Sequence, residues 1–413
     1  MNRLKAAPGR FIIFATLFFI AIFVVENINH RFWLNDFRVY YSAAQAMING
    51  TKVYDTLFAL GSGYYKYSPF TSLLILPFIF FSYPVAAVLQ FIFLCFSIIA
   101  VFIVASHILN RYVFNGKPEN ENLFLSLAFF CVVNHLVREL HLGNINMLLL
   151  FLLCLSLLFM LNKKTILAGI MLAVVIITKP FFVLLFFPLL MHREFKTIFS
   201  SSVSLLLFVV NPAILTGFPK NIELHRDWIR TMLEHNASFP SNNTIENLVR
   251  VYVDPGLPGN FQYAVMLLAC IGYFMFYYRS KKLIKGKTEQ SKLRVSNFVL
   301  EWFAWIAAMP LIFKTDTQHF LLSLPLILFL LRRITMAKKY AWTICFIILM
   351  CIYGANSSDL LGKVLSLKMD KSGILGLSNI IIIVWTLVTY VKLCKERPDV
   401  PSPWFETQSV VAR

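Results

Sequence analysis

Long apolar runs alternate with short polar loops along almost the whole chain, and this pattern predicts a bundle of membrane-spanning helices. A helix needs about 20 apolar residues to cross the hydrocarbon core of a bilayer, and several runs here are somewhat shorter. The predicted spans lie near 11–27, 84–109, 122–138, 145–161, 165–177, 180–191, 197–216, 261–279, 297–313, 319–331, 341–354 and 374–393. The predicted fold class is therefore all-α, a polytopic transmembrane helical bundle of about 12 spans.

One apolar run, 69–81, is too short to assign from hydropathy alone, and it is either a short span or an interfacial, re-entrant helix. The basic residues favour the second alternative. If this run does not cross, most of the 38 Lys and Arg residues, including Arg332-Arg333, fall on the cytoplasmic side, as the positive-inside rule requires. We therefore predict that both termini lie inside and that loops 28–83 and 217–260 share the outer face.

Composition agrees with a membrane protein. Hydrophobic residues make up 58% of the 413 residues and charged residues only 14%, more apolar surface than a soluble chain of this length can bury. The net charge of +18 lies in short loops between apolar runs, which indicates membrane topology and anionic headgroups rather than nucleic acid. The seven cysteines form no disulfide framework and no CxxC metal motif.

A single integral membrane domain is predicted over 1–392, followed by a cytoplasmic tail over 393–413 that contains three prolines and no apolar run. The first apolar run, Phe11–Val25, follows basic residues as in a signal peptide, but no small-x-small cleavage pattern comes after it. We interpret it as an uncleaved first span. The expected location is the inner (plasma) membrane of the cell, as a multi-pass protein.

A polar segment directly after the first span carries the first candidate for chemistry. Asp36 and Arg38 lie in the sequence Asp-Phe-Arg-Val-Tyr-Tyr, and a carboxylate at a bilayer interface is costly unless it is used. An ionised Asp can remove the proton from an acceptor hydroxyl that attacks a sugar, and Arg38 is expected to keep it ionised. The alternative is that Asp36 caps an amphipathic helix, since the following residues have helix-like spacing.

Four further candidates fall in segments that the predicted topology places on the same outer face. Asn144 and Asn146 precede a helix, where they are either caps or part of a phosphate site at the helix N-terminus. Lys179, between two short apolar runs, is either a phosphate contact or a loop lysine that reaches the headgroups. Asn243 lies in the loop 217–260, and His319 begins a later span, where it either ends a helix or donates to a phosphate.

The segment from Asp36 to Asp55, followed by Lys-Tyr-Ser-Pro-Phe and an apolar run, resembles the opening of glycosyltransferase family 87, which comprises polytopic GT-C-type enzymes. The positions that carry the resemblance are Asp36, Phe37, Val39, Tyr40, Ala43, Ala44, Tyr54, Asp55, Tyr67, Pro69, Phe70, Leu76 and Pro77. Later motifs that are similar to those of the family are Gly143–Asn146, Lys179-Pro180, Asn242–Thr244 and Gln318-His319. The chain departs from the pattern at 144 and 243–244, and it lacks the usual aromatic residue before the histidine.

The resemblance implies a GT-C-like bundle with interfacial helices in the first outer loop, an outer-face active site, and Asp36 as the catalytic base. It implies a hexosyltransferase that moves a mannose-like sugar, with inversion, from a polyprenyl-phosphate donor to an envelope lipid or glycan acceptor. Membrane lipids are the other expected partners, and nucleic acid is not one. No nucleotide-binding glycine loop and no carboxylate pair for a metal stand out in the sequence, so we expect no cofactor and no metal.

Under this hypothesis the donor phosphate is bound by Lys179, Arg38 and His319, which offset the charge on the leaving group. The expected contacts to the sugar and the acceptor are Tyr40, Tyr41, Tyr67, Asn144, Asn146 and Asn243. Two other classes remain as alternatives. A secondary transporter would explain the broken helices near Lys179, and a lipid-carrier flippase of envelope assembly would share the phosphate site. A flippase needs no base such as Asp36.

Overall fold

The protein is described by a computed structural model in which residues 8–61, 63–238, 242–254, 290–354 and 358–396 are placed, together with Gly256 and some residues between 264 and 282. Nearly half of the predicted span at 261–279, and residues 397–413 of the predicted tail, lie outside the described residues.

Helices dominate the described part of the chain, which confirms the all-α fold class. The helices are α1 (Gly9–Ile28), α2 (Asn35–Ile48), α3 (Pro69–Ile79), α4 (Tyr83–Tyr112), α5 (Glu121–Leu142), α6 (Asn146–Leu161), α7 (Thr165–Thr178), η1 (Pro180–Leu185), α8 (Phe186–Met191), α9 (Phe195–Val210), α10 (Ala213–Thr216), α11 (Phe218–Ser238), α12 (Ile245–Tyr252), α14 (Gln290–Ile312), η2 (Thr317–Ser323), α15 (Leu324–Ala337), α16 (Tyr340–Gly354), α17 (Ser358–Lys371) and α18 (Ile374–Glu396). Two short antiparallel strands, β1 (Leu57–Ala59) and β2 (Gly63–Tyr64), form a hairpin after α2.

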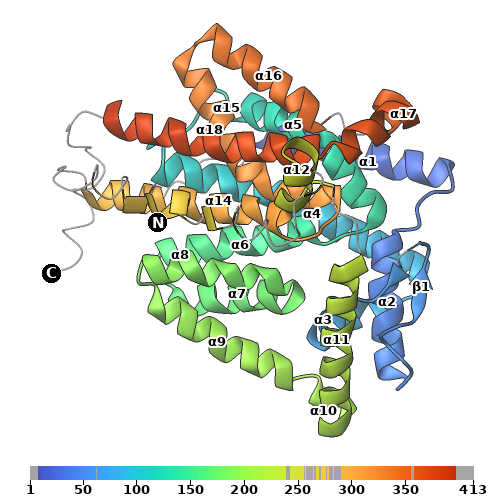
Figure 1. Cartoon of the computed structure of the whole chain (residues 1–413). Coiled ribbons are helices and arrows are strands. Elements are labelled where there is room, and N and C mark those ends of the chain that lie inside the picture. Colours follow the sequence, from blue (N-terminus) through green and yellow to red (C-terminus); the bar gives the residue numbers. More distant parts are fainter. Residues whose placement is uncertain are drawn as a thin grey trace.

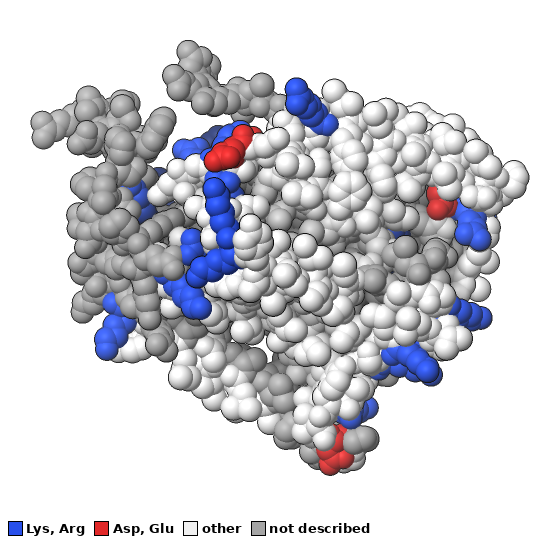
Figure 2. All heavy atoms as spheres, turned by 90° about the horizontal axis from the view of Figure 1, so that it is seen from above, with Lys and Arg blue, Asp and Glu red and all other residues white. Residues whose placement is uncertain are grey.

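Seven of the described helical segments are long and apolar enough to cross a membrane: α1, α4, α5, α9 with α10, α14, η2 with α15, and α18. Four shorter apolar segments, α6, α7, η1 with α8, and α16, coincide with further predicted spans. Together they account for every predicted span except 261–279. Figure 2 shows charged side chains gathered toward the two ends of the molecule, with a largely uncharged surface between them. The chain is thus a polytopic helical membrane protein.

A second layer of helices closes one end of the bundle. In Figure 1, α2 and α11 run roughly across the direction of α14 and α18, at the end opposite to the one where α1 begins and α18 ends. Helix α3 packs against α2 and has only 11 residues, which gives a length of about 16 Å, well short of the hydrocarbon core. This agrees with the prediction that 69–81 lies at an interface and does not cross.

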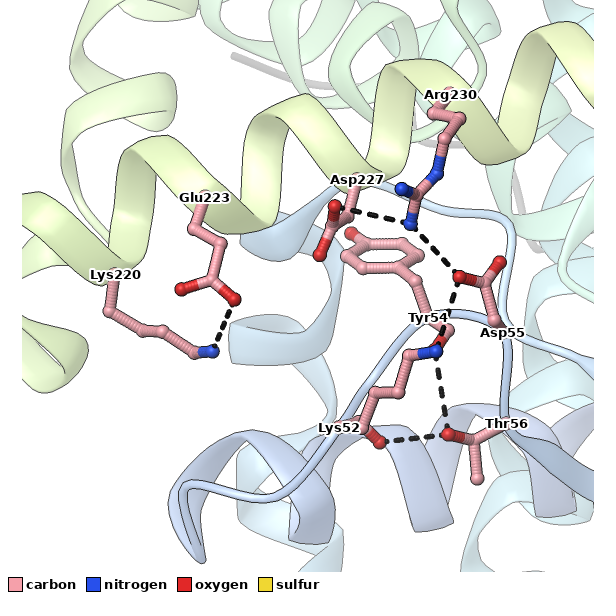
Figure 3. Close-up of polar contacts among 8 residues, drawn as sticks. All are labelled: Lys52, Tyr54, Asp55, Thr56, Lys220, Glu223, Asp227 and Arg230. Atoms are coloured by element: carbon pink, nitrogen blue, oxygen red, sulfur yellow. Dashed lines mark hydrogen bonds and ion pairs between the residues drawn. The ribbon is translucent and has the colours of Figure 1, made fainter.

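Helix α11 is attached to the loop after α2 by an ion-pair network (Figure 3). Asp55 Oδ2 lies 2.9 Å from Arg230 Nη2 and 3.3 Å from Lys52 Nζ, and Arg230 also pairs with Asp227 at 3.3 Å. Exposed pairs of this kind contribute only about 0–1 kcal/mol each. A less exposed contact adds to them, because the Trp228 indole Nε1 donates to the backbone oxygen of Lys66 at 3.2 Å.

Two tyrosines shape the turn that leads into α3. Tyr54 donates through its hydroxyl to the backbone oxygen of Tyr67 at 2.9 Å, and Tyr65 donates to that of Ser68 at 3.0 Å. Ser68 then caps α3, since its Oγ accepts from the backbone N–H of Thr71 at 3.3 Å. These bonds fix the backbone on both sides of Lys66 and Tyr67, whose side chains belong to the site described below.

Gly143 allows the turn between α5 and α6 to pack directly on the start of α2. It ends α5 with a left-handed backbone (φ 68°), and a Cβ atom there would lie 2.9 Å from the Cβ atoms of both Leu34 and Phe37. Only glycine fits this conformation and this contact without strain. The close approach brings Asn144 within reach of Asp36 on the neighbouring helix.

We expect Gly143→Ala to destabilise the protein by about 2–4 kcal/mol, because it combines a left-handed alanine with an overpacked contact. The readout is the apparent unfolding temperature in detergent. Gly50→Ala is the matched control, because Gly50 has the same φ of 68° but open space around its Cβ position; its loss should be about 1–2 kcal/mol. Equal losses in the two variants would contradict the packing argument.

The predicted topology has a direct test in a background with the seven native cysteines replaced by serine. Cysteines placed at Lys52 and Glu223 should react with a membrane-impermeant maleimide in intact cells, because the positive-inside rule assigns their loops to the outer face. A cysteine at Lys163, in the short basic loop between α6 and α7, should react only after the membrane is permeabilised. Protection of Glu223→Cys in intact cells would overturn the shared outer face.

Candidate active site

Asp36 lies in the first turn of α2 but does not cap it. The N-cap position is Leu34, which makes no capping bond through its side chain. The partly buried Asp36 carboxylate instead accepts, through Oδ2, a hydrogen bond of 2.6 Å from Nδ2 of Asn144. The structure therefore contradicts the capping alternative and connects two of the predicted site residues.

Burial makes the Asp36 carboxylate more basic than that of an ordinary aspartate, and the charges around it adjust this effect in both directions. Burial raises the pKa of the Asp36 carboxyl, and the hydrogen bond from Asn144 lowers it. The neighbouring carboxylate of Asp316 raises that pKa further, whereas the ammonium groups of Lys179 and Lys66 lower it; the net direction is upward. Burial also lowers the pKa of Lys66, against the opposing effects of Asp316 and Asp36. A carboxylate of raised pKa is a stronger base near neutral pH.

Glu139 is a site residue that the sequence analysis missed. Its fully buried carboxylate accepts from the backbone N–H of Met147 at 3.0 Å and from Nδ2 of Asn146 at 2.9 Å. The first turn of α6 is thus bonded to Glu139, and its N-cap, Ile145, makes no side-chain capping bond. The prediction that Asn144 or Asn146 caps this helix is therefore wrong, whereas the phosphate at its N-terminus stays a prediction. The available signal was an acidic residue at the end of a membrane helix, which is costly without a partner.

Lys179 is buried, with 5% of its surface exposed, so it is not a loop lysine that reaches the headgroups. Its Nζ donates to Oδ1 of Asn146 at 2.5 Å and to Nε2 of His319 at 2.6 Å. An ammonium has no lone pair, so His319 Nε2 must be the acceptor. The proton of this imidazole is then on Nδ1, which donates to the backbone oxygen of Asp316 at 3.2 Å. His319 therefore supports Lys179 as a neutral ring.

Tyr40 and Tyr67 form the aromatic part of the site. Their hydroxyls lie 3.0 Å apart in a hydrogen bond, and their rings are perpendicular with centroids 5.0 Å apart. Tyr40 follows Asp36 by four residues and so shares its face of α2. Lys179 Nζ lies 5.9 Å from the centre of the Tyr67 ring. Tyr67 thus contacts both Tyr40, on the Asp36 face of α2, and the ammonium of Lys179.

Three of the predicted site residues contact other parts of the molecule. Arg38 is exposed, and its guanidinium lies over the Tyr83 ring, 5.6 Å from the centroid. The hydroxyl of Tyr41 donates to the backbone oxygen of Phe81 at 2.8 Å. Asn243 accepts from the backbone N–H of Gly376 at 3.2 Å and so fastens its loop to α18. The positive charge expected near Asp36 comes from Lys66 and Lys179 instead of Arg38.

We call the assembled group the polar cluster, and its members come from α2, the loop before α3, α5, the α5–α6 turn, α6, the α7–η1 junction, the segment before η2 and η2 itself. It consists of Asp36, Tyr40, Lys66, Tyr67, Glu139, Asn144, Asn146, Lys179, Asp316 and His319. Chemically it offers a basic carboxylate and a buried ammonium. Within the described residues, no group of three or more His, Cys, Asp or Glu side chains is placed to hold a metal ion.

A helical membrane bundle with such a polar cluster between its helices defines an integral membrane protein with a candidate active site. The sequence profile of glycosyltransferase family 87 matches residues 65–288, more than half of the chain. The chain belongs to this family, and the resemblance seen in the sequence is confirmed. The protein is therefore a membrane glycosyltransferase. The matched stretch contains Lys66, Glu139 and Lys179 but begins after Asp36 and ends before His319.

The chain is also similar to an alpha-(1->3)-arabinofuranosyltransferase of Corynebacterium glutamicum, with 25% identity over 197 residues. The alignment covers 46% of this chain and 44% of the relative, so the chain matches less than half the length of that protein.

The opposite effects of Asp316 and Lys66 on the Asp36 pKa predict that two variants shift the pH profile of kcat/KM in opposite directions. Asp316→Asn removes a negative charge that raises the Asp36 pKa, so the acidic limb of the kcat/KM profile should move to lower pH. Lys66→Gln removes a positive charge that lowers that pKa, so the limb should move to higher pH. In both, activity is lost as pH falls through the Asp36 pKa, because the base becomes protonated.

The pH profile is measured as sugar transfer at subsaturating substrate, and Glu223→Gln serves as the control because its carboxylate pairs with Lys220 on the exposed surface of α11. The control profile should coincide with that of the wild type. A shift in the same direction for Asp316→Asn and Lys66→Gln would refute the assignment of the acidic limb to Asp36.

Proposed function

We propose that this chain transfers a sugar from a polyprenyl-phosphate donor to a hydroxyl of an envelope lipid or glycan at the outer face of the inner (plasma) membrane, with Asp36 as the general base. The observation that carries the proposal is the geometry of Asp36. Asn144 holds one carboxylate oxygen at 2.6 Å, while the other, Oδ1, has no hydrogen bond within the described residues. A basic carboxylate with one oxygen held and the other available suits proton removal from an incoming hydroxyl.

The reaction is a single displacement at the anomeric carbon. The acceptor oxygen forms the new bond to that carbon as its proton passes to Asp36. The bond from the anomeric carbon to the phosphate oxygen breaks, and polyprenyl phosphate leaves with the electron pair, so the configuration inverts. Lys179, supported by His319 and Asn146, offsets the charge that develops on the leaving phosphate.

Acceptor recognition is assigned to the residues on the Asp36 side of the cluster. Tyr40, Tyr67 and Asn144 are the proposed contacts, because their polar atoms already bond within the cluster near the carboxylate. Asn146 is assigned instead to the support of Lys179. Arg38, Tyr41 and Asn243 are not part of this proposal because the structure gives them other partners.

Two sugars are candidates for the group that is transferred. The family resemblance suggests a mannose-like hexose, whereas the arabinofuranosyltransferase from Corynebacterium glutamicum suggests a pentofuranose. Presenting polyprenyl-phosphate mannose and polyprenyl-phosphate arabinofuranose to the purified protein in parallel distinguishes them. Family membership favours a transferase over the transporter and flippase alternatives, and transfer from either donor would exclude an exclusively transporting role.

The central test of the proposed function is Asp36→Asn. The amide still accepts the hydrogen bond from Asn144 but cannot take a proton, and general-base catalysis contributes typically about 10²–10⁴-fold. We expect at least a roughly 100-fold loss of turnover, with unchanged protein yield, unfolding temperature and donor binding. Asp227→Asn, which alters a carboxylate in the α11 ion-pair network, should stay within a few-fold of wild type. A fully active Asp36→Asn enzyme would end the general-base proposal.

A further inference from the structure

The carboxamide of Asn146 lies between two opposite charges, and its two ends are not equivalent. Nδ2 donates to Oε2 of Glu139 at 2.9 Å, and Oδ1 accepts from Nζ of Lys179 at 2.5 Å. Rotating the amide by half a turn would place an N–H against the ammonium and an oxygen against the carboxylate. Both contacts would be repulsive, so the charge on Glu139 determines which end of Asn146 faces Lys179.

Glu139 is itself held in one position. Its other oxygen, Oε1, accepts from the backbone N–H of Met147 at 3.0 Å, in the first turn of α6. Its side chain has no exposed surface. Because both oxygens are bonded to donors and no part of the residue is accessible, Glu139 is not placed to take a proton from an acceptor as Asp36 is.

The Lys179 ammonium donates hydrogen bonds to two neutral groups. The carboxylate that balances its charge does not bond to it directly but bonds to one of these two groups. Asn146 and His319 take two of its three N–H donors. Glu139 supplies the opposing charge through Asn146, without bonding to the ammonium. This arrangement keeps a buried cation in a membrane bundle, and within the described residues the third N–H of Lys179 has no hydrogen-bond acceptor.

We propose that Glu139 is a positioning residue for donor binding: by orienting the amide of Asn146, it directs the Lys179 ammonium toward the phosphate of the donor lipid. This inference rests on the proposed function, because it takes the ligand of Lys179 to be a polyprenyl phosphate. It assigns a role to a residue that touches neither the sugar nor the acceptor.

The first test is Glu139→Gln, measured as binding of polyprenyl phosphate to the purified protein in detergent. The introduced glutamine can still accept from Met147, but its amide N–H₂ then faces Asn146. Asn146 must turn its oxygen toward that amide and its own N–H₂ toward Lys179, which displaces the ammonium. We expect affinity for polyprenyl phosphate to fall by roughly 10- to 100-fold, as for the loss of a charge-assisted contact, with the KM for the acceptor changed much less.

The second test is the double variant Glu139→Gln with Asn146→Asp, which restores the order of hydrogen-bond donors and acceptors between Met147 and Lys179. The introduced amide then donates to the introduced carboxylate, and that carboxylate accepts from Lys179, so every hydrogen bond regains a donor and an acceptor and the net charge is conserved. Affinity for polyprenyl phosphate should return to within a few-fold of wild type. If Glu139→Gln alone is not recovered in folded form, the double variant decides: folding with wild-type affinity supports the proposal, and folding without it overturns the proposal.

Glu301→Gln is the matched control, because Glu301 is also a buried carboxylate in a membrane helix, bonded to His192 and Tyr273. It should leave polyprenyl phosphate affinity unchanged even if stability falls. If Glu139→Gln folds and binds polyprenyl phosphate as well as wild type does, Glu139 has no positioning role, although the proposed function stands. If the wild-type protein does not bind polyprenyl phosphate at all, the proposed function fails with it.

Discussion

The burial of one ammonium group, that of Lys179, is the constraint on which the rest of the site depends. A cation between membrane helices is stable only with hydrogen-bond acceptors and an opposing charge close by. Asn146 and His319 provide the acceptors, and Glu139 provides the charge through Asn146. These partners come from α5, α6 and η2, so the requirements of one lysine are met by side chains from three membrane segments.

Backbone geometry then brings the second half of the site to the first. Gly143 lets the α5–α6 turn contact the start of α2, and Asn144, the next residue, bonds to Asp36. The hydrogen-bonded tyrosines after α2 set the turn that carries Tyr67 toward Lys179. The base and the ammonium therefore sit on different layers of the molecule, Asp36 on the end layer of α2, α3 and α11 and Lys179 within the bundle. This division suits a reaction in which the acceptor and the lipid phosphate arrive from different surroundings.

Membership of glycosyltransferase family 87 gives this arrangement its chemical setting. A transferase of this kind must deprotonate one substrate while stabilising negative charge on the other. In the proposed mechanism the polar cluster divides these two tasks between Asp36, a carboxylate of raised pKa, and the ammonium of Lys179. Burial raises the pKa of that carboxylate most, and Asp316 and Lys66, from distant segments, adjust it in opposite directions.

The sequence by itself determined the membrane bundle, the family and two central residues, because these depend on local rules. Apolar runs must be helical in lipid, and isolated charges such as Asp36 and Lys179 are conspicuous beside them. Only the tertiary structure decided which groups face these charges. Arg38, two residues from Asp36, lies over the Tyr83 ring, whereas Lys66 and Glu139, remote from Asp36 in sequence, belong to the cluster. Likewise, Asn146 was recognised as a polar residue before a helix, but its orientation between Glu139 and Lys179 was not predicted. The reason is physical: a hydrogen bond has a direction and a partner, and both are set by packing between helices, which hydropathy and local spacing do not encode.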